Sequence, residues 1–145
     1  MPNAPRQIVN DTFEPVFEAF ELRLIELDTD EFMFIGNGFA ILIWFDRDGV
    51  WVYYFRTNEK DLNLIDLCLF IMRTRGWVPF KSTSKTSGLE DRWRDECAAC
   101  CINFNKYAAD ILEGETQWLN DADRSSFPLS ETWQKRIKSV LADAK

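Results

Sequence analysis

Four cysteines and two groups of acidic residues are the side chains of this sequence best suited to chemistry. Cys97, Cys100 and Cys101 contain a C-x-x-C spacing, which can hold zinc or cycle between thiol and disulfide. A zinc site needs four ligands, yet the chain has no histidine and only Cys68 as a further thiol. The three residues also fall on the apolar stripe of an expected helix. We therefore predict that these cysteines are buried, reduced and free of metal.

The acidic residues form two short groups, and a turn is expected at each. Asp28, Asp30 and Glu31 make one group, and Asp46 with Asp48 makes the other. Neighbouring carboxylates can bind a hard cation or act as an acid and base pair. Asp is also common in turns because its side chain accepts hydrogen bonds from nearby backbone amides. We favour turns, and since the absence of histidine removes the commonest general base, we expect no enzymatic activity, no metal and no cofactor.

Strands followed by helices are expected to position these residues. Aromatic and branched residues predict strands at 31–35, 39–45 and 50–55, and Asp48-Gly49 predicts a tight turn. A strand is also favoured at 21–27, where a helix fits about as well. Residues 1–10 are expected to be a loose lead-in. Helices are expected at 12–20, at 61–74 with Asp61 as its cap, at 89–113 with Gly114 as its end, and after Ser130.

This order of elements predicts a single α+β domain over residues 1–145. We expect an antiparallel β-meander of three or four strands packed by three to four C-terminal helices, with a short N-terminal helix. The strand at 39–45 is apolar on both faces. Both of its faces should therefore be covered.

Charge is the strongest functional signal in the sequence. The chain has a net charge of −7, and residues 11–31 alone hold eight acids and one base. This balance disfavours nucleic acid and anionic membranes as partners and favours a basic protein. A solvated acidic face without a function explains the same pattern equally well. If the face is functional, the predicted partner-binding residues are Glu14, Glu18, Glu21, Asp28, Asp30 and Glu31, joined by Asp46 and Asp48.

Aromatic residues give a second signal. The chain contains six Trp, three Tyr and twelve Phe, and Trp44, Trp51, Tyr53 and Tyr54 all fall on the expected hairpin. Most of these rings should pack in the core. One or two of them are expected at the surface, where Trp and Tyr dominate protein interfaces.

Three segments together carry a resemblance to a known class of proteins. They are the D-R-x-G hairpin with its Tyr-rich strand (46–54), the leucine-rich helix ending R-x-R-G-W (73–77), and the segment YAADILEGETQWL (107–119). Over roughly residues 13–120 the chain resembles small bacterial immunity proteins encoded beside polymorphic toxins. The resemblance implies a cytoplasmic protein that binds one cognate toxin and blocks it, and it carries no catalytic residue across.

Three functions follow from these observations. The first is an immunity-type protein that neutralises a cognate, basic toxin domain. The second is an adaptor or chaperone for a secreted effector, and the third is an enzyme of unknown type. The N-terminus has no apolar signal region, and no apolar run approaches the length of a membrane span. We expect a cytoplasmic location and a toxin or effector protein as partner, and we leave a homodimer open.

Overall fold

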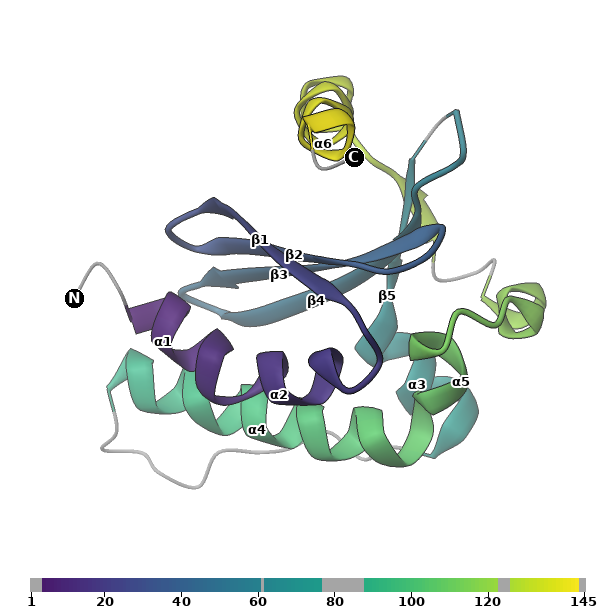
Figure 1. The fold of residues 1–145 in the computed structure, drawn as a ribbon. Helices are drawn as coiled ribbons and strands as arrows, with labels where there is room; N and C mark the ends of the chain where they lie inside the picture. Colours follow the sequence, from purple (N-terminus) through teal and green to yellow (C-terminus); the bar gives the residue numbers. More distant parts are fainter. Residues whose placement is uncertain (1–3, 61, 77–87, 123–125, 144–145) are drawn as a thin grey trace.

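One antiparallel sheet of six strands organises the molecule. The computed structural model describes residues 4–60, 62–76, 88–122 and 126–143, and its strands lie side by side in chain order (Figure 1). They are β1 (Arg23–Asp28), β2 (Glu31–Ile35), β3 (Phe39–Asp46), β4 (Gly49–Arg56), β5 (Asn63–Asp66) and β6 (Ser126–Pro128). Every neighbouring pair is antiparallel. The predicted α+β class is confirmed, with more strands than the three or four expected.

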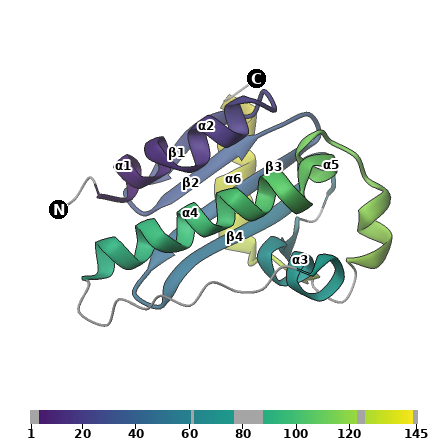
Figure 2. The ribbon, with the colours of Figure 1, turned by 90° about the horizontal axis from the view of Figure 1, so that it is seen from below.

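Helices cover both faces of this sheet. On one side lie α1 (Ala4–Asp11), α2 (Phe13–Glu18), α3 (Leu67–Arg75), α4 (Leu89–Tyr107) and α5 (Ala109–Leu112), while α6 (Glu131–Asp143) crosses the other (Figure 1, Figure 2). A short 3-10 helix, η1 (Gln117–Asp121), precedes β6. Among the described residues, no helix combines the length and the apolar composition needed to cross a bilayer.

The central strand β3 is buried on both faces, as the sequence predicts. Alternate residues of a strand point to opposite faces of its sheet. Ile41 and Ile43 therefore join the core beneath α1, α2 and α4, while Ala40 and Leu42 pack in a second cluster with Ile137 of α6. The sheet thus separates two apolar cores.

The meander agrees closely with the sequence prediction. β2 has the predicted bounds, β3 is one residue longer than predicted at the turn, and β4 is one residue longer at each end. The segment 21–27, for which helix and strand were both open, is a strand from Arg23. Glu21 adopts a left-handed conformation (φ 64°), which ends the preceding helical segment.

The N-terminal prediction is wrong in its boundaries. Residues 4–11 form helix α1 rather than a loose lead-in, and α2 follows it after a break at Thr12. Pro5 is tolerated in α1 because the first turn of a helix needs no backbone donor there. Ile8 and Val9 are fully buried. The burial of these two side chains stabilises a helix that is too short to be evident from periodicity.

The predicted helix at 61–74 is also wrong in its first half. Residues 63–66 form β5, which pairs with β4 through Tyr53 and Tyr54. Helix α3 then begins at Leu67, and its cap is Asp66, whose Oδ1 accepts a hydrogen bond from the Leu69 amide at 3.0 Å. Asp61, the expected cap, lies outside the described residues. A continuous apolar run does not distinguish a buried strand from a buried helix.

The helix predicted at 89–113 is present with one interruption. It divides into α4 and α5 at Ala108, which has φ −122° and ψ 15°. Gly114 has φ 94°, the left-handed conformation expected of a glycine that ends a helix. The last predicted helix is α6, which starts directly after Ser130.

Candidate partner-binding surface

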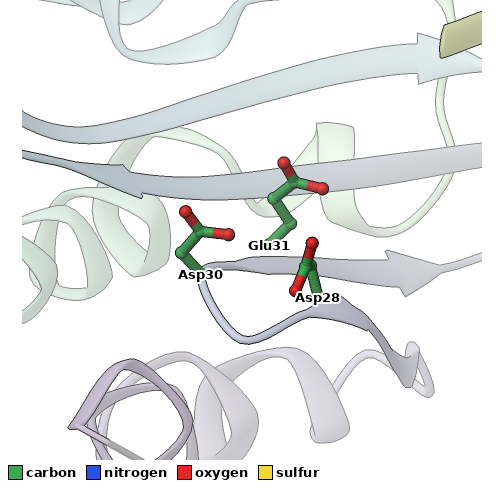
Figure 3. A group of neighbouring side chains, drawn as sticks. All are labelled: Asp28, Asp30 and Glu31. Atoms are coloured by element: carbon green, nitrogen blue, oxygen red, sulfur yellow. The ribbon is translucent and has the colours of Figure 1, made fainter. Parts of the chain in front are cut away.

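Two acidic turns meet at one end of the sheet. The β1–β2 turn carries Asp28, Asp30 and Glu31, and the β3–β4 turn carries Asp46 and Asp48. The Phe45 amide donates a hydrogen bond to the Asp30 carbonyl oxygen at 2.9 Å, so the turns lie side by side. One carboxylate oxygen from each of Asp28, Asp30 and Glu31 lies within 4.8 Å of the others (Figure 3). We call these five residues the acidic end.

The other three predicted partner-binding residues lie elsewhere. Glu14 and Glu18 belong to α2, on the side of the sheet that faces α4, and Glu21 follows α2 just before β1 begins. β1 has six residues, which corresponds to about 20 Å of extended chain. Glu21 is therefore separated from the acidic end by the length of β1. The structure brings together five of the eight predicted residues and leaves three apart.

Glu31 is a buried anchor for α6. Glu31 is only 8% exposed, and its Oε2 pairs with Nη1 of Arg136 at 3.1 Å. Arg136 also donates to the Leu27 carbonyl oxygen at 2.7 Å and lies 3.9 Å from the Asp28 carboxylate. Burial raises the pKa of Glu31, the charges of the neighbouring aspartates add to the rise, and Arg136 opposes it. This pair fixes α6 against the acidic end.

The counter-charge in this cluster therefore comes from a guanidinium group. Three neighbouring carboxylates could bind a hard cation through oxygen. Here Arg136 already lies against two of them. The sequence-based expectation of no metal stays a prediction.

Asp46 holds the second turn in shape. Its Oδ1 accepts hydrogen bonds from the amides of Asp48 (2.8 Å) and Gly49 (3.0 Å), and its Oδ2 accepts one from the indole of Trp51 (3.0 Å). This is the turn-forming role that the sequence favours for Asp46. Asp48 is exposed. Asp30 is half-buried, and within the described residues no side chain donates a hydrogen bond to the carboxylates of Asp30 or Asp48.

Helix α4 holds the same hairpin from the opposite side. The indole of Trp93 donates to the Asp46 carbonyl oxygen at 2.8 Å, and Glu96 accepts a hydrogen bond from the Val50 amide at 2.9 Å. Gly49 is needed at this point because it has φ 151° and a Cβ there would lie 2.9 Å from Glu96 Oε2. Burial raises the pKa of Glu96, and its bond to Val50 opposes the rise. The β3–β4 turn is thus held by hydrogen bonds from α4 as well as by Asp46.

Replacing Glu96 tests this anchor. Glu96→Ala is expected to lower the free energy of unfolding by about 1–2 kcal/mol, because the Val50 amide loses its acceptor in a half-buried site. Glu96→Gln keeps an acceptor and removes a charge that burial disfavours, so it should be at least as stable as the parent at neutral pH. A carboxyl whose folded pKa is raised destabilises the fold above that pKa, so the advantage of Gln should vanish as the pH falls through it. Urea unfolding over a pH series measures both effects; equal losses for Ala and Gln would contradict them.

The hairpin aromatics divide between core and surface. Tyr54 is fully buried, Trp44 and Tyr53 are half-buried, and Trp51 is 36% exposed. The rings of Trp51 and Tyr53 stack with centroids 6.5 Å apart. The expectation that most of these rings pack inward with one or two at the surface agrees with this arrangement.

Sequence reasoning did not identify Arg136 as part of this surface. The residue lies in the C-terminal helix, and it contacts a turn more than a hundred positions earlier in the chain. The only local signal was its position three residues after Trp133, because a basic side chain at that spacing on a helix lies beside the ring. The Arg136 guanidinium is 5.2 Å from the centroid of the Trp133 ring. Nothing local to 28–31 indicates the pairing.

The predicted burial of the cysteines is confirmed. Cys97, Cys100 and Cys101 are 0%, 6% and 7% exposed, and Cys100 Sγ lies 3.8 Å from Cys68 Sγ. Burial raises the pKa of the Cys97 thiol and raises that of Cys101 to about 12. The pKa of Cys68 is raised by its contact with Cys100 and by burial. Since the thiolate is the reactive form, the thiols of Cys68, Cys97 and Cys101 should be unreactive at neutral pH.

Thiol titration checks this expectation. With a water-soluble disulfide reagent, the native protein should react far more slowly than the protein in concentrated urea, where all four thiols become accessible. Rapid reaction of two or more thiols in the native protein would contradict the assignment. Stoichiometric zinc in the purified protein would contradict it as well.

Comparison with known proteins provides no relative for this chain: no protein-family model, no curated protein and no solved structure matches it. The surface therefore has to be interpreted from its own geometry and charge.

Proposed function

We propose that this is a cytoplasmic, immunity-type binding protein that neutralises a cognate toxin domain by protein–protein contact, and that the toxin domain is basic. The observation that supports the proposal is the acidic end, where two turns from different hairpins bring five acidic residues close together. The resemblance of residues 13–120 to immunity proteins points in the same direction.

The acidic end suits a folded, basic partner. Two of its acids, the half-buried Asp30 and the exposed Asp48, lie on turns that are already fixed by Asp46 and by the Glu31–Arg136 pair. A rigid surface loses little conformational entropy on binding. Carboxylates at its rim attract a basic protein from a distance and raise the association rate. Such a surface can cover the Lys and Arg residues with which a nuclease binds phosphates, and no catalytic residue or cofactor is needed for this inhibition.

A rigid acidic end fits an adaptor or chaperone less well. A protein that holds an unfolded client needs a broad apolar surface, whereas the acidic end presents charge on two tight turns. The adaptor function therefore ranks second, and a partner that binds only when it is unfolded would favour it.

Complex formation tests the proposed function. The protein should be co-expressed with the product of the gene adjacent to its own, purified through a tag on one chain, and analysed by size-exclusion chromatography and calorimetry. We expect a stable complex, loss of the partner's toxic activity, and an affinity that falls as salt concentration rises. Absence of a complex with a correctly folded partner would contradict the proposal.

A further inference from the structure

An apolar groove lies beside the acidic end, on the face of the sheet that α6 crosses. It has a volume of about 230 Å³ and is lined by Leu42, Trp44, Tyr53, Leu64, Leu129 and Trp133. The first three belong to β3 and β4, and Trp133 is on α6. Trp44 pairs across the strands with Glu31, so the groove and the acidic end are adjacent.

Two carboxylates lie near this groove. Asp46 lies two residues beyond Trp44 on the same strand, and Asp66 is the cross-strand partner of Tyr53. Both charges act on the Tyr53 hydroxyl, whose pKa is raised by burial first and then by Asp66 and Asp46. The nearby cation Arg136 is committed to Glu31, Asp28 and the Leu27 carbonyl. Asp46 and Asp66 are therefore two carboxylates near the groove with which Arg136 does not pair.

The size and lining of the groove fit a side chain better than a small-molecule ligand. Ligand pockets in proteins usually have volumes of about 300–1,000 Å³, and this groove is smaller. Partly buried Trp and Tyr residues are the types that dominate binding energy in protein interfaces. An apolar lining with two carboxylates nearby is complementary to an apolar side chain that has basic neighbours.

We propose that this groove receives a segment of the cognate toxin in which one apolar side chain is flanked by Lys or Arg. The apolar side chain inserts between Trp44 and Trp133. The flanking bases approach the carboxylates of Asp46 and Asp66, which keep their hydrogen bonds to the β3–β4 turn and to the Leu69 amide. This inference rests on the proposed function and adds the contact that holds the complex once the acidic end has attracted the partner. Contacts of this kind act mainly on the dissociation rate, whereas rim charges act on association.

A peptide titration tests the groove without knowledge of the toxin. The probe is a capped octapeptide with two central leucines flanked by lysines, and two matched peptides replace either the leucines by serines or the lysines by glutamates. In nitrogen-15 NMR spectra, the lysine and leucine peptide should shift the indole signals of Trp44 and Trp133. The serine peptide should bind at least about tenfold more weakly, and the glutamate peptide should not bind. Shifts confined to residues away from the groove, or equal affinity for all three peptides, would overturn the inference.

Variants of the protein test the groove in the toxin complex. Trp44→Ala should raise the dissociation rate by about 10–100-fold, as expected for an interface anchor. Ile102→Ala is the matched control, because Ile102 is a large apolar residue 69% exposed on α4, across the sheet from the groove. Normal binding by a folded Trp44→Ala variant would overturn the groove and leave the proposed function intact. Absence of any complex with the parent protein would overturn the proposed function, and the peptide titration would then decide on the groove alone.

Discussion

Replacing Arg136 by methionine is expected to destabilise the protein by about 2–3 kcal/mol at neutral pH. Removing one partner of a buried ion pair costs about 3–5 kcal/mol, and the value here is smaller because the Arg136 side chain is 39% exposed. The substitution leaves the carboxylate of Glu31 buried next to Asp28 and Asp30 without its cation. It also removes the hydrogen bond to the Leu27 carbonyl. Urea unfolding of the two proteins measures the difference.

The pH dependence of this loss identifies its cause. Burial already raises the pKa of Glu31 above its ordinary value of 4.5, and removal of Arg136 should raise it further. For a carboxyl with a raised folded pKa, the destabilisation is fully present above that pKa and disappears as the pH falls through it. The Arg136→Met variant should therefore approach the parent protein in mildly acidic solution. A constant difference over that range would show that lost packing, rather than an unpaired charge, accounts for the effect.

A second substitution provides the matched control. Glu31→Gln combined with Arg136→Met removes both charges, so the double variant should be more stable at neutral pH than Arg136→Met alone. If the double variant is instead less stable by the sum of the single losses, then Glu31 and Arg136 do not stabilise the protein as a pair. The result bears on function because this pair fixes α6, and with it Trp133, beside the acidic end.

The meander was predictable from sequence because its signals are local. Alternating aromatic and branched residues, interrupted by Asp48-Gly49, specify a hairpin within a short window. The confirmed bounds of β2 reflect this. The two-faced burial of β3 was predictable for the same reason, since both sets of alternate residues are apolar.

The elements that were predicted wrongly depend on contacts between distant segments. Residues 63–66 become a strand because β4 and β6 offer hydrogen-bond partners on both sides, and no short window contains that information. Helix α1 exists because Ile8 and Val9 are buried, and the sequence around them is otherwise polar with two prolines. Tertiary packing overrides local preference in both cases.

The candidate site shows the same limit. From the sequence, the five carboxylates of the acidic end were all predicted to bind a partner. The structure shows that they have different roles. Glu31 is buried against α6 and Asp46 holds its own turn, whereas no described side chain donates a hydrogen bond to the carboxylate of Asp30 or Asp48. Charge counting along the chain identifies a region, but only the strand register and the position of α6 distinguish anchors from rim residues.

Reversing the charges of Asp30 and Asp48 should slow capture of a basic partner by at least about tenfold, because electrostatic steering raises association rates by about 10–10³-fold. The variant is Asp30→Lys with Asp48→Lys, which alters the acidic end and keeps both Glu31 and Asp46. The dissociation rate should change less, since rim charges act mainly on the encounter. Stopped-flow association at several salt concentrations measures the effect, and the salt dependence of the association rate should weaken in the variant.

The association rate should depend on where the charges lie rather than on the net charge of the protein. A matched variant separates these two effects. Glu18→Lys with Glu21→Lys changes the net charge by the same amount, but its residues lie at the other end of β1. At physiological salt, charges farther apart than about 8 Å are largely screened, and β1 extends for about 20 Å. The matched variant should therefore associate nearly as fast as the parent. If both variants slow association equally, then the partner responds to the overall charge of the protein and the acidic end is not its contact. If only the Glu18→Lys, Glu21→Lys variant slows association, then the interface lies on the side of α2.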